Sequence, residues 1–216
     1  MTTTDSPKKK GSVPRWLAIP TAKPQLNTAE VASKYPRLRF QVFMGIFIGY
    51  ATFYLIRNNV PLVTPILTHE LGFSNAAIGA LSTALLLAYG FSKFFTAMIS
   101  DRSNARLFLP IGLVLSGIAN VLLAIAGYMG SGAAAAGYGA AIASTMAAIM
   151  VFNGIFQGMG WPPSGRVLVN WFSTSERGSK VSLWNTAHNV GGALSGLLVA
   201  WGFTLFGKTW QVAFWF

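Results

Sequence analysis

Two permanent cations stand inside long apolar stretches of the sequence. Arg57 lies in the stretch that begins near residue 40, and Lys93 lies in the next, a little over two helical turns before Ser100. Burying a charge at membrane depth costs at least about 2.5–3.5 kcal/mol on insertion scales, so both side chains must face water or the protein interior. The acidic residues all lie outside the apolar stretches, and these are Asp5, Glu30, Glu70, Asp101 and Glu176.

Cations without carboxylate partners predict an anionic ligand. The arginine fork fits phosphate oxygens with two N–H donors, and lysine adds a point charge. His188, about two turns into the last long apolar stretch, could add a donor that depends on protonation. Two alternatives remain open: Lys93 could extend to the lipid headgroups, and His188 could be a helix-packing residue.

Helical spacing groups further polar and aromatic residues with these three. Tyr50, Tyr54 and Arg57 stand at i, i+4 and i+7 and therefore share one helix face. Three other stretches carry similar pairs, as expected around a water-accessible cavity, although the tyrosines and Trp161 could instead belong to an interfacial aromatic belt. The candidate ligand-binding residues are Arg57, Lys93, His188, Tyr50, Tyr54, Tyr89, Gln157, Trp161 and Asn185.

Membrane helices must position these residues. Of the 216 residues, 53% are hydrophobic and only 10% are charged, which is the composition of an integral membrane protein rather than a soluble domain. Five apolar segments have about the 20 residues that a spanning helix needs. We expect an all-α membrane fold with spans near 40–66, 76–99, 107–127, 139–162 and 181–206, and the start of a sixth at Trp210.

The basic residues alternate between the connections. Residues 1–39 form a basic tail, expected to be irregular, with eight of the sixteen Lys and Arg residues, and the second and fourth connections are also basic. Positive connections mark the cytoplasmic side, which predicts a cytoplasmic N-terminus; Lys208 is the one dissenting charge. A net charge of +11 could indicate a nucleic-acid binder, but this distribution argues against that interpretation, and we expect the lipid bilayer and no nucleic acid as partner.

The second connection, "SDRSNAR", combines an acid with two arginines. Asp101 could cap the following helix and pair with Arg102 or Arg106 across helix ends. These three residues are candidate gating residues, unless the segment is an ordinary basic loop. The sequence has no cysteine, no metal-ligand cluster and no phosphate-cradling Gly-Lys-Ser/Thr loop, so we expect neither an enzyme nor a cofactor.

Five separated segments resemble one transporter family. They are "RFQVFMGIFIGYATFYLIRNN", "AYGFSKF", "SDRSNARLFLP", "FQGMGWPPSGR" and "SERGSKVSLWNTAHNVGG". They look like the organophosphate:phosphate antiporters of the major facilitator superfamily, with the strongest likeness to bacterial glycerol-3-phosphate transporters and then to hexose-phosphate transporters. The resemblance covers roughly residues 38–216.

The resemblance implies a twelve-span fold in two six-helix halves, with the ligand between them. This chain would be the N-terminal half, ending at the start of span six, and the missing C-terminal half would complete the pocket. Arg57 matches a phosphate-binding arginine of the family, the other eight candidates match positions that line this half of the pocket, and the second connection matches the gating motif. The implied activity is exchange of inorganic phosphate for an organic phosphate ester in the bacterial inner membrane.

Two positions depart from the glycerol-3-phosphate pattern. Asn58 stands where a lysine is familiar, and Phe53 where a tyrosine is familiar. Both departures weaken the case for glycerol-3-phosphate in particular. A membrane sensor of external sugar phosphate and a half-length pseudotransporter remain alternatives.

Overall fold

The computed structural model describes residues 13–21, 24, 26–135 and 139–215, and this part of the chain is helical with no named β-strand. Eight α-helices and one short 3-10 helix occur in it. Their bounds are α1 Thr28–Leu55, α2 Asn59–Leu71, α3 Asn75–Arg102, α4 Ala105–Ala135, α5 Gly139–Gln157, α6 Trp161–Trp171, α7 Thr174–Asn185, α8 Ala187–Phe206 and η1 Trp210–Phe214.

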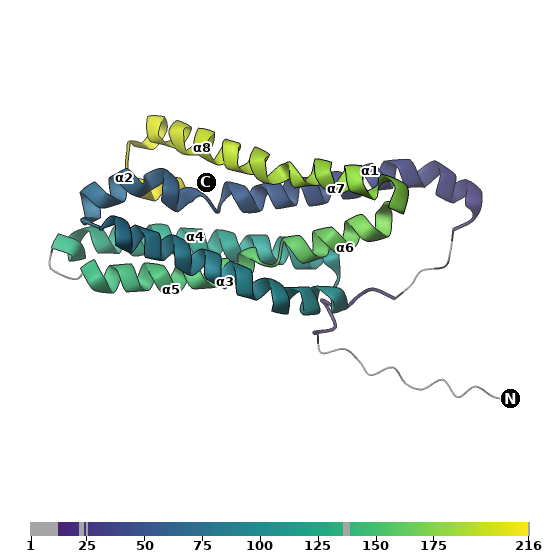
Figure 1. The fold of residues 1–216 in the computed structure, drawn as a ribbon, viewed down its shortest axis with the longest axis horizontal. Helices are drawn as coiled ribbons and strands as arrows, with labels where there is room; N and C mark the ends of the chain where they lie inside the picture. The colour runs from purple at the N-terminus through teal and green to yellow at the C-terminus, as the bar shows by residue number, and fades with distance from the viewer. Residues whose placement is uncertain (1–12, 22–23, 25, 136–138, 216) are drawn as a thin grey trace.

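The helices lie side by side along the long axis of the molecule (Figure 1). In Figure 1, α2 continues the line of α1, α8 continues that of α7, and α6 continues that of α5. Five segments are long and apolar enough to cross a membrane: Thr28–Glu70, Asn75–Arg102, Ala105–Tyr128, Ala140–Trp171 and Thr174–Phe206. The expected all-helical membrane fold is therefore confirmed.

The first spanning segment is interrupted at Arg57, whereas the sequence pattern predicted one continuous segment over 40–66. α1 ends at Leu55 and α2 begins at Asn59. Pro61 explains the position of the break, because a proline ring in a helix collides with the carbonyl group four residues earlier, which here belongs to Arg57. The interruption places Arg57 at the junction of two helices.

The fourth spanning segment is interrupted in the same way. α5 ends at Gln157 and α6 begins at Trp161, and Pro162 and Pro163 occupy the first turn of α6. In a regular helix the two proline rings would collide with the carbonyl groups of Gly158 and Met159, four residues earlier. Gln157, like Arg57, therefore lies at the end of a helix.

α1 begins about twelve residues earlier than the expected start of the first span near residue 40. A capping box starts the helix at Thr28: the Asn27 side chain accepts from the Glu30 backbone N–H at 2.8 Å, and the Glu30 carboxylate accepts from the Asn27 N–H at 3.3 Å. Residues 28–39, which the sequence pattern placed in an irregular tail, are helical here. Side-chain contacts hold this extension, since Tyr35 donates to the Trp171 carbonyl at 2.6 Å and Arg39 pairs with Glu176.

Residues 13–21 lie at the end of the bundle where α3 meets α4. The carbonyl oxygen of Leu17 accepts from the Asn104 N–H at 2.7 Å, and Ala18 pairs with Ser103 in an isolated antiparallel bridge. The Leu17 side chain is buried. This segment therefore packs against the connection between α3 and α4.

Close packing of helices depends on glycine at two contacts. A Cβ atom at Gly191 of α8 would lie 2.1 Å from the Ala51 carbonyl oxygen of α1, and one at Gly154 of α5 would lie 2.4 Å from the Leu85 carbonyl oxygen of α3. Glycine allows the backbones to approach closely, as is common in membrane helix pairs. These contacts set the α1–α8 and α3–α5 distances.

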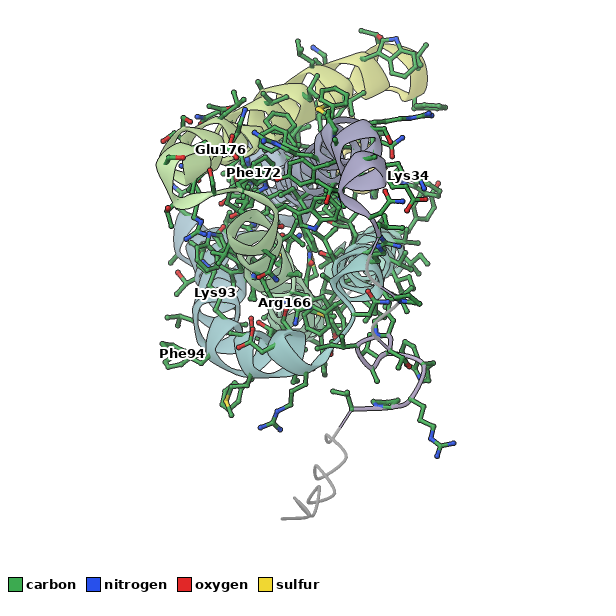
Figure 2. The ribbon with its side chains drawn as sticks, turned by 90° about the vertical axis from the view of Figure 1, so that its right-hand side faces the viewer. Lys34, Lys93, Phe94, Arg166, Phe172 and Glu176 are labelled. Carbon is green, nitrogen blue, oxygen red and sulfur yellow. The ribbon has the colours of Figure 1, made fainter. Side chains whose placement is uncertain are left out.

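Large apolar side chains remain on the outside of the bundle. On α3, Phe91, Phe94 and Phe95 are each about two-thirds or more exposed, and Phe94 points away from the other helices (Figure 2). A soluble monomer rarely exposes so much contiguous apolar surface. A surface of this kind fits contact with lipid or with further protein.

Candidate functional site

Arg57 is held between aromatic rings at the α1–α2 break. Its Cζ atom lies 4.2 Å from the centre of the Tyr54 ring and 4.0 Å from that of Tyr89. Both contacts fall within cation–π range, where a desolvated pair contributes about 2 kcal/mol or more. The rings orient the guanidinium plane without neutralising its charge.

One edge of the same guanidinium is bound to Gln157. The Nε and Nη2 atoms each donate to Oε1 of Gln157 at 3.0 Å. Arginine carries five N–H donors, and Gln157 occupies two of them. The ion pairs of the described residues join Lys34 to Glu30 and Arg39 to Glu176, so neither Arg57 nor Lys93 is paired with an acid there.

Lys93 meets Arg57 at Tyr89. The Nζ atom of Lys93 lies 3.9 Å from the centre of the Tyr89 ring, which also contacts the Arg57 guanidinium. Both cationic side chains are half-buried. The first spanning segment supplies Arg57 and the second, α3, supplies Lys93. Both cations therefore contact the same aromatic ring, that of Tyr89.

Further aromatic contacts extend the cluster to α8. The ring centres of Tyr50 and Tyr54 are 5.3 Å apart, and those of Tyr54 and His188 are 5.4 Å apart. The sequence pattern did not single out Trp184. Its ring centre lies 4.4 Å from that of Tyr50, with the rings tilted by 33°, and its indole N–H donates to the Ile46 carbonyl at 3.2 Å. The structure thus connects seven of the nine candidate residues: Tyr50, Tyr54, Arg57, Tyr89, Lys93, Gln157 and His188.

Trp161 and Asn185 stand outside this connected set. Both side chains are exposed, and no hydrogen bond, ring contact or cation–π contact joins either to the cluster within the described ranges. Both remain candidates through their helical spacing and through the resemblance to the transporter family.

The two departures from the transporter pattern have different surroundings. Phe53 is fully buried, and its ring lies against Gly160 at the α5–α6 break, where a Cβ atom would come within 2.8 Å of it. Asn58 is half-buried, and its amide nitrogen lies 3.3 Å from where a Cβ atom at Gly192 of α8 would be. Phe53 is therefore a packing residue, whereas Asn58 lies at the α1–α2 break beside α8.

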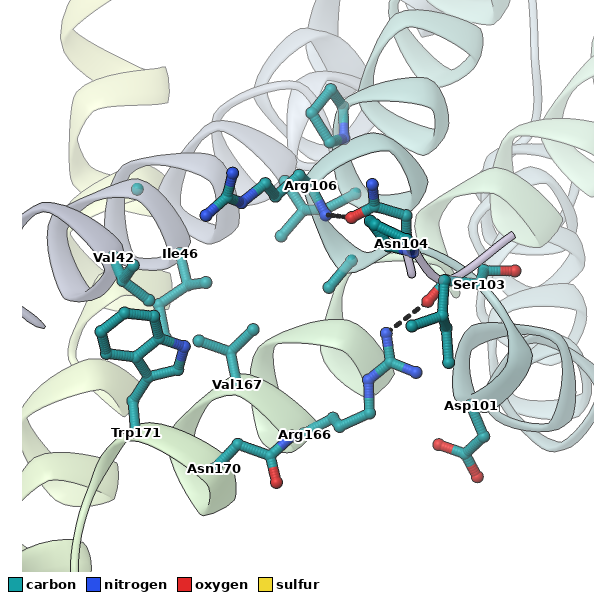
Figure 3. Close-up of a pocket in the computed structure, with 16 residues that line it drawn as sticks. Val42, Ile46, Asp101, Ser103, Asn104, Arg106, Arg166, Val167, Asn170 and Trp171 are labelled. Atoms are coloured by element: carbon teal, nitrogen blue, oxygen red, sulfur yellow. Dashed lines mark hydrogen bonds between the residues drawn. The ribbon is translucent and has the colours of Figure 1, made fainter. Parts of the chain in front are cut away.

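The candidate gating residues lie at one end of the bundle, where Figure 3 shows a cavity of about 650 Å³. Asp101 and Arg106 line it together with Arg166 of α6. Asn104, not Asp101, caps α4, because its side-chain oxygen accepts from the Arg106 N–H at 3.1 Å. The expected cap by Asp101 is therefore wrong, and no Asp101–Arg106 ion pair occurs in the described part of the chain.

Arg166 is the residue at this end that the sequence pattern missed. It donates to the carbonyl oxygens of Ser100 and Ser103 at 2.5 Å each. These two carbonyls flank the end of α3, so Arg166 ties α6 to the connection that carries Asp101 and Arg102. A basic residue three positions after "WPP" was a signal, but the pattern gave it no partner.

The sequence pattern also missed buried polar residues behind the cluster. Ser116 and Asn120 of α4 and Asn153 of α5 are each at most 3% exposed. Ser116 and Asn120 stand at i and i+4, as do Asn153 and Gln157, so the helical spacing that grouped the aromatic residues could have found them. They hydrogen-bond to one another and to Gln157.

The fold and the cation cluster define a multi-pass α-helical membrane protein. Residues 46–216 match the family model of the Major Facilitator Superfamily. The chain is 46% identical over 192 residues to the glycerol-3-phosphate transporter of Bacillus subtilis (strain 168), covering 89% of this chain and 40% of that protein. It is 38% identical over 167 residues to a probable hexose phosphate transport protein of Chlamydia trachomatis serovar D, covering 76% and 33%.

A third relative has a different described role. The chain is 38% identical over 186 residues to the membrane sensor protein UhpC of Escherichia coli (strain K12), covering 86% of this chain and 39% of that protein. The chain therefore spans at most about two-fifths of the length of these relatives. It belongs to the Major Facilitator Superfamily, and the likeness to organophosphate transporters that the motifs indicated is confirmed. The family and the relatives named as transporters indicate that the protein is not an enzyme.

Proposed function

We propose that the chain forms the N-terminal half of a secondary antiporter that exchanges inorganic phosphate for an organic phosphate ester by alternating access. The observation that carries the proposal is the state of Arg57. Two rings and Gln157 fix its guanidinium, and no acid neutralises its charge among the described residues. A preorganised fork of this kind suits two oxygens of one phosphate group.

The other site residues have supporting roles in this proposal. Lys93 adds a second positive charge at Tyr89, and His188 adds a donor through its place beside Tyr54. Tyr50, Trp161 and Asn185 complete this half of the pocket. A C-terminal half would supply the remaining contacts, and the two halves would rock about the bound anion.

The connection between α3 and α4 would act as the latch of this movement. Asp101, Arg102 and Arg106 would face the other half of the protein, and Arg166 would keep their connection in place through its two carbonyl contacts. A bound anion can favour rearrangement only through its different affinity for the two states. The empty carrier should therefore exchange more slowly than the loaded one.

The proposed setting is the bacterial inner membrane with a cytoplasmic N-terminus. Support comes from the basic residues, since Arg102, Arg106 and Arg177 lie in the helix ends beside the α3–α4 and α6–α7 connections, while the α2–α3 connection carries no Lys or Arg. Glycerol-3-phosphate is the first ester to test because a transporter named for it is 46% identical. Hexose phosphates follow, since Asn58 replaces the familiar lysine beside Arg57.

A membrane sensor of external sugar phosphate is the second candidate function. The observation that favours it is the 38% identity to a protein named as a membrane sensor. Uptake of labelled ester measured beside a signalling reporter separates the two: a transporter accumulates the ester, whereas a sensor changes the reporter without uptake. The half-length alternative is tested by the coding sequence downstream of Phe216, where an immediate stop codon would support it.

The decisive test is phosphate exchange by the complete protein in proteoliposomes. Arg57→Lys should abolish counterflow of labelled phosphate against glycerol-3-phosphate and hexose phosphates, because one ammonium group cannot replace the fork. Arg37→Lys makes the same chemical change on an exposed part of α1 and should leave exchange intact. Near-normal exchange by the Arg57→Lys variant would refute the proposed role of the guanidinium.

A further inference from the structure

A continuous line of buried hydrogen bonds runs from Arg57 into the bundle. Arg57 donates to the Gln157 oxygen, and the Gln157 amide nitrogen donates to the Ser116 hydroxyl at 2.7 Å. The Ser116 hydroxyl donates in turn to the Asn153 side-chain oxygen. Gln157, Ser116 and Asn153 are at most 1% exposed.

The direction of this line is fixed by its chemistry. A hydroxyl group has one hydrogen to donate, and Ser116 uses it on Asn153. The Ser116 oxygen must therefore accept, which requires the nitrogen of the Gln157 amide to face it and the oxygen to face Arg57. With the amide turned round, its N–H donors would face the guanidinium, which has only donors. Ser116 thus sets which end of Gln157 meets Arg57.

A second line holds the backbone next to Arg57. Asn59, the first residue of α2, donates to the Asn120 side-chain oxygen at 3.3 Å and accepts from the Ser195 hydroxyl of α8 at 3.4 Å. Asn120 itself donates to the Ser116 carbonyl at 2.9 Å. Asn59 is only two residues after Arg57, so this line anchors the α1–α2 break between α4 and α8.

Both lines meet on one turn of α4. Ser116 and Asn120 are four residues apart and share a helix face. No candidate ligand-binding residue lies on α4. α4 acts on the Arg57 side chain through Gln157 and on the neighbouring backbone through Asn59. A shift of this turn of α4 would therefore move the guanidinium through both contacts.

We infer that Ser116 and Asn120 are positioning residues for anion binding, which rests on the proposed function of Arg57. Ser116 acts through the orientation of Gln157, and Asn120 acts through Asn59. The effect should be the same for both proposed substrates, because the fork that they position binds the phosphate group that inorganic phosphate and the esters share.

Ser116→Ala provides the first test in the complete protein. The change leaves the Gln157 amide nitrogen buried without its acceptor and frees the amide to turn, so the half-saturating phosphate concentration for exchange should rise about tenfold. The maximal rate should change little. Ser144→Ala makes the same change on an exposed face of α5, where the hydroxyl bonds only within its helix, and should leave the concentration unchanged.

Double variants separate positioning from general packing. In a Gln157→Ala background, Ser116→Ala should cause no further loss of phosphate affinity, because the group through which it acts is gone. Asn120→Ala should still weaken binding in that background but not in an Asn59→Ala background. Equal losses in every background, or a Ser116→Ala variant that matches Ser144→Ala, would overturn the inference.

The readout also separates this inference from the proposed function. If the parent protein exchanges no phosphate, the proposed function fails, and thermal unfolding in detergent then tests the network. The Ser116→Ala and Gln157→Ala changes should lower the unfolding temperature non-additively, because they break the same hydrogen bond. Additive effects would overturn the network as well.

Discussion

At the scale of single residues, the proposed anion site requires a buried cation whose charge stays available to a ligand. A buried arginine normally gains stability from a carboxylate partner, but such a pair leaves little charge for a ligand. Here Tyr54 and Tyr89 stabilise the cation through their ring faces, and the neutral Gln157 occupies one guanidinium edge. The side chain is thus oriented without being neutralised.

Gln157→Glu tests this interpretation at the residue scale. The change keeps the shape of the side chain but places a carboxylate about where the amide oxygen lies, 3.0 Å from two guanidinium nitrogens. The new ion pair should compete with the ligand and weaken phosphate binding by about tenfold or more. The measurement is the half-saturating phosphate concentration for exchange.

Gln41→Glu is the matched control for that prediction. Gln41 lies on the exposed side of α1, so the added carboxylate would lie on the outside of the bundle. Its variant should bind phosphate like the parent. An unchanged affinity in Gln157→Glu would mean that Arg57 does not hold the anion.

At the scale of elements, helix ends create the site. Pro61 interrupts the first span at Arg57, and Pro162 and Pro163 interrupt the fourth just after Gln157. A side chain at a break is freed from the regular spacing of its helix, and nearby backbone groups need partners that only buried polar residues can supply. The contact between Arg57 and Gln157 therefore joins two interrupted helices.

Gly191→Ala tests the packing that holds these elements together. A methyl group at Gly191 would lie 2.1 Å from the Ala51 carbonyl oxygen, and backbone cannot move aside easily. The α1–α8 pair should separate slightly, at a cost in stability of about 1–3 kcal/mol. Thermal unfolding in detergent should show a lower midpoint for this variant.

Gly196→Ala is the control on the same helix. A Cβ atom there meets nothing within 4 Å, and alanine is the better helix former. The unfolding midpoint should stay or rise. A Gly191→Ala protein as stable as this control would contradict the close approach of α1 and α8.

At the scale of the whole molecule, the bundle places its basic connections together. Two spans separate the start of α1 from the α3–α4 connection, and two more separate that connection from the α6–α7 connection. An even number of crossings returns the chain to the same side, so all three lie at one end of the molecule (Figure 1). Arg39, Arg106 and Arg177 lie there. Lys208 lies at the opposite end, after α8.

Cysteine labelling in intact cells tests the orientation. The sequence has no cysteine, so a single introduced residue reports its own side of the membrane. Lys208→Cys should react with a membrane-impermeant maleimide added outside, and Ser179→Cys should react only after the cells are opened. Both positions are exposed, and the reverse pattern would place the N-terminus outside.

The sequence by itself determined the class of this protein and the residues that are candidates for its binding site. Apolar segments of spanning length can be satisfied in lipid only as helices, and cations within them need an interior ligand or partner. Arg57, Lys93 and their tyrosines were identifiable because spacing along one helix fixes which side chains share a face. The same local rule could have drawn attention to Ser116 and Asn120.

Only the tertiary structure decided which of these residues meet. The Arg57–Gln157 contact joins positions 100 residues apart, and the Ser116–Asn153 and Asn59–Asn120 contacts join positions 37 and 61 apart. Helical periodicity holds only within one element and says nothing of how two elements are turned toward each other. The rotation of each helix toward its neighbours depends on close packing at glycines such as Gly191 and on the proline breaks. These rotations also decide which edge of the Arg57 guanidinium stays open to a ligand.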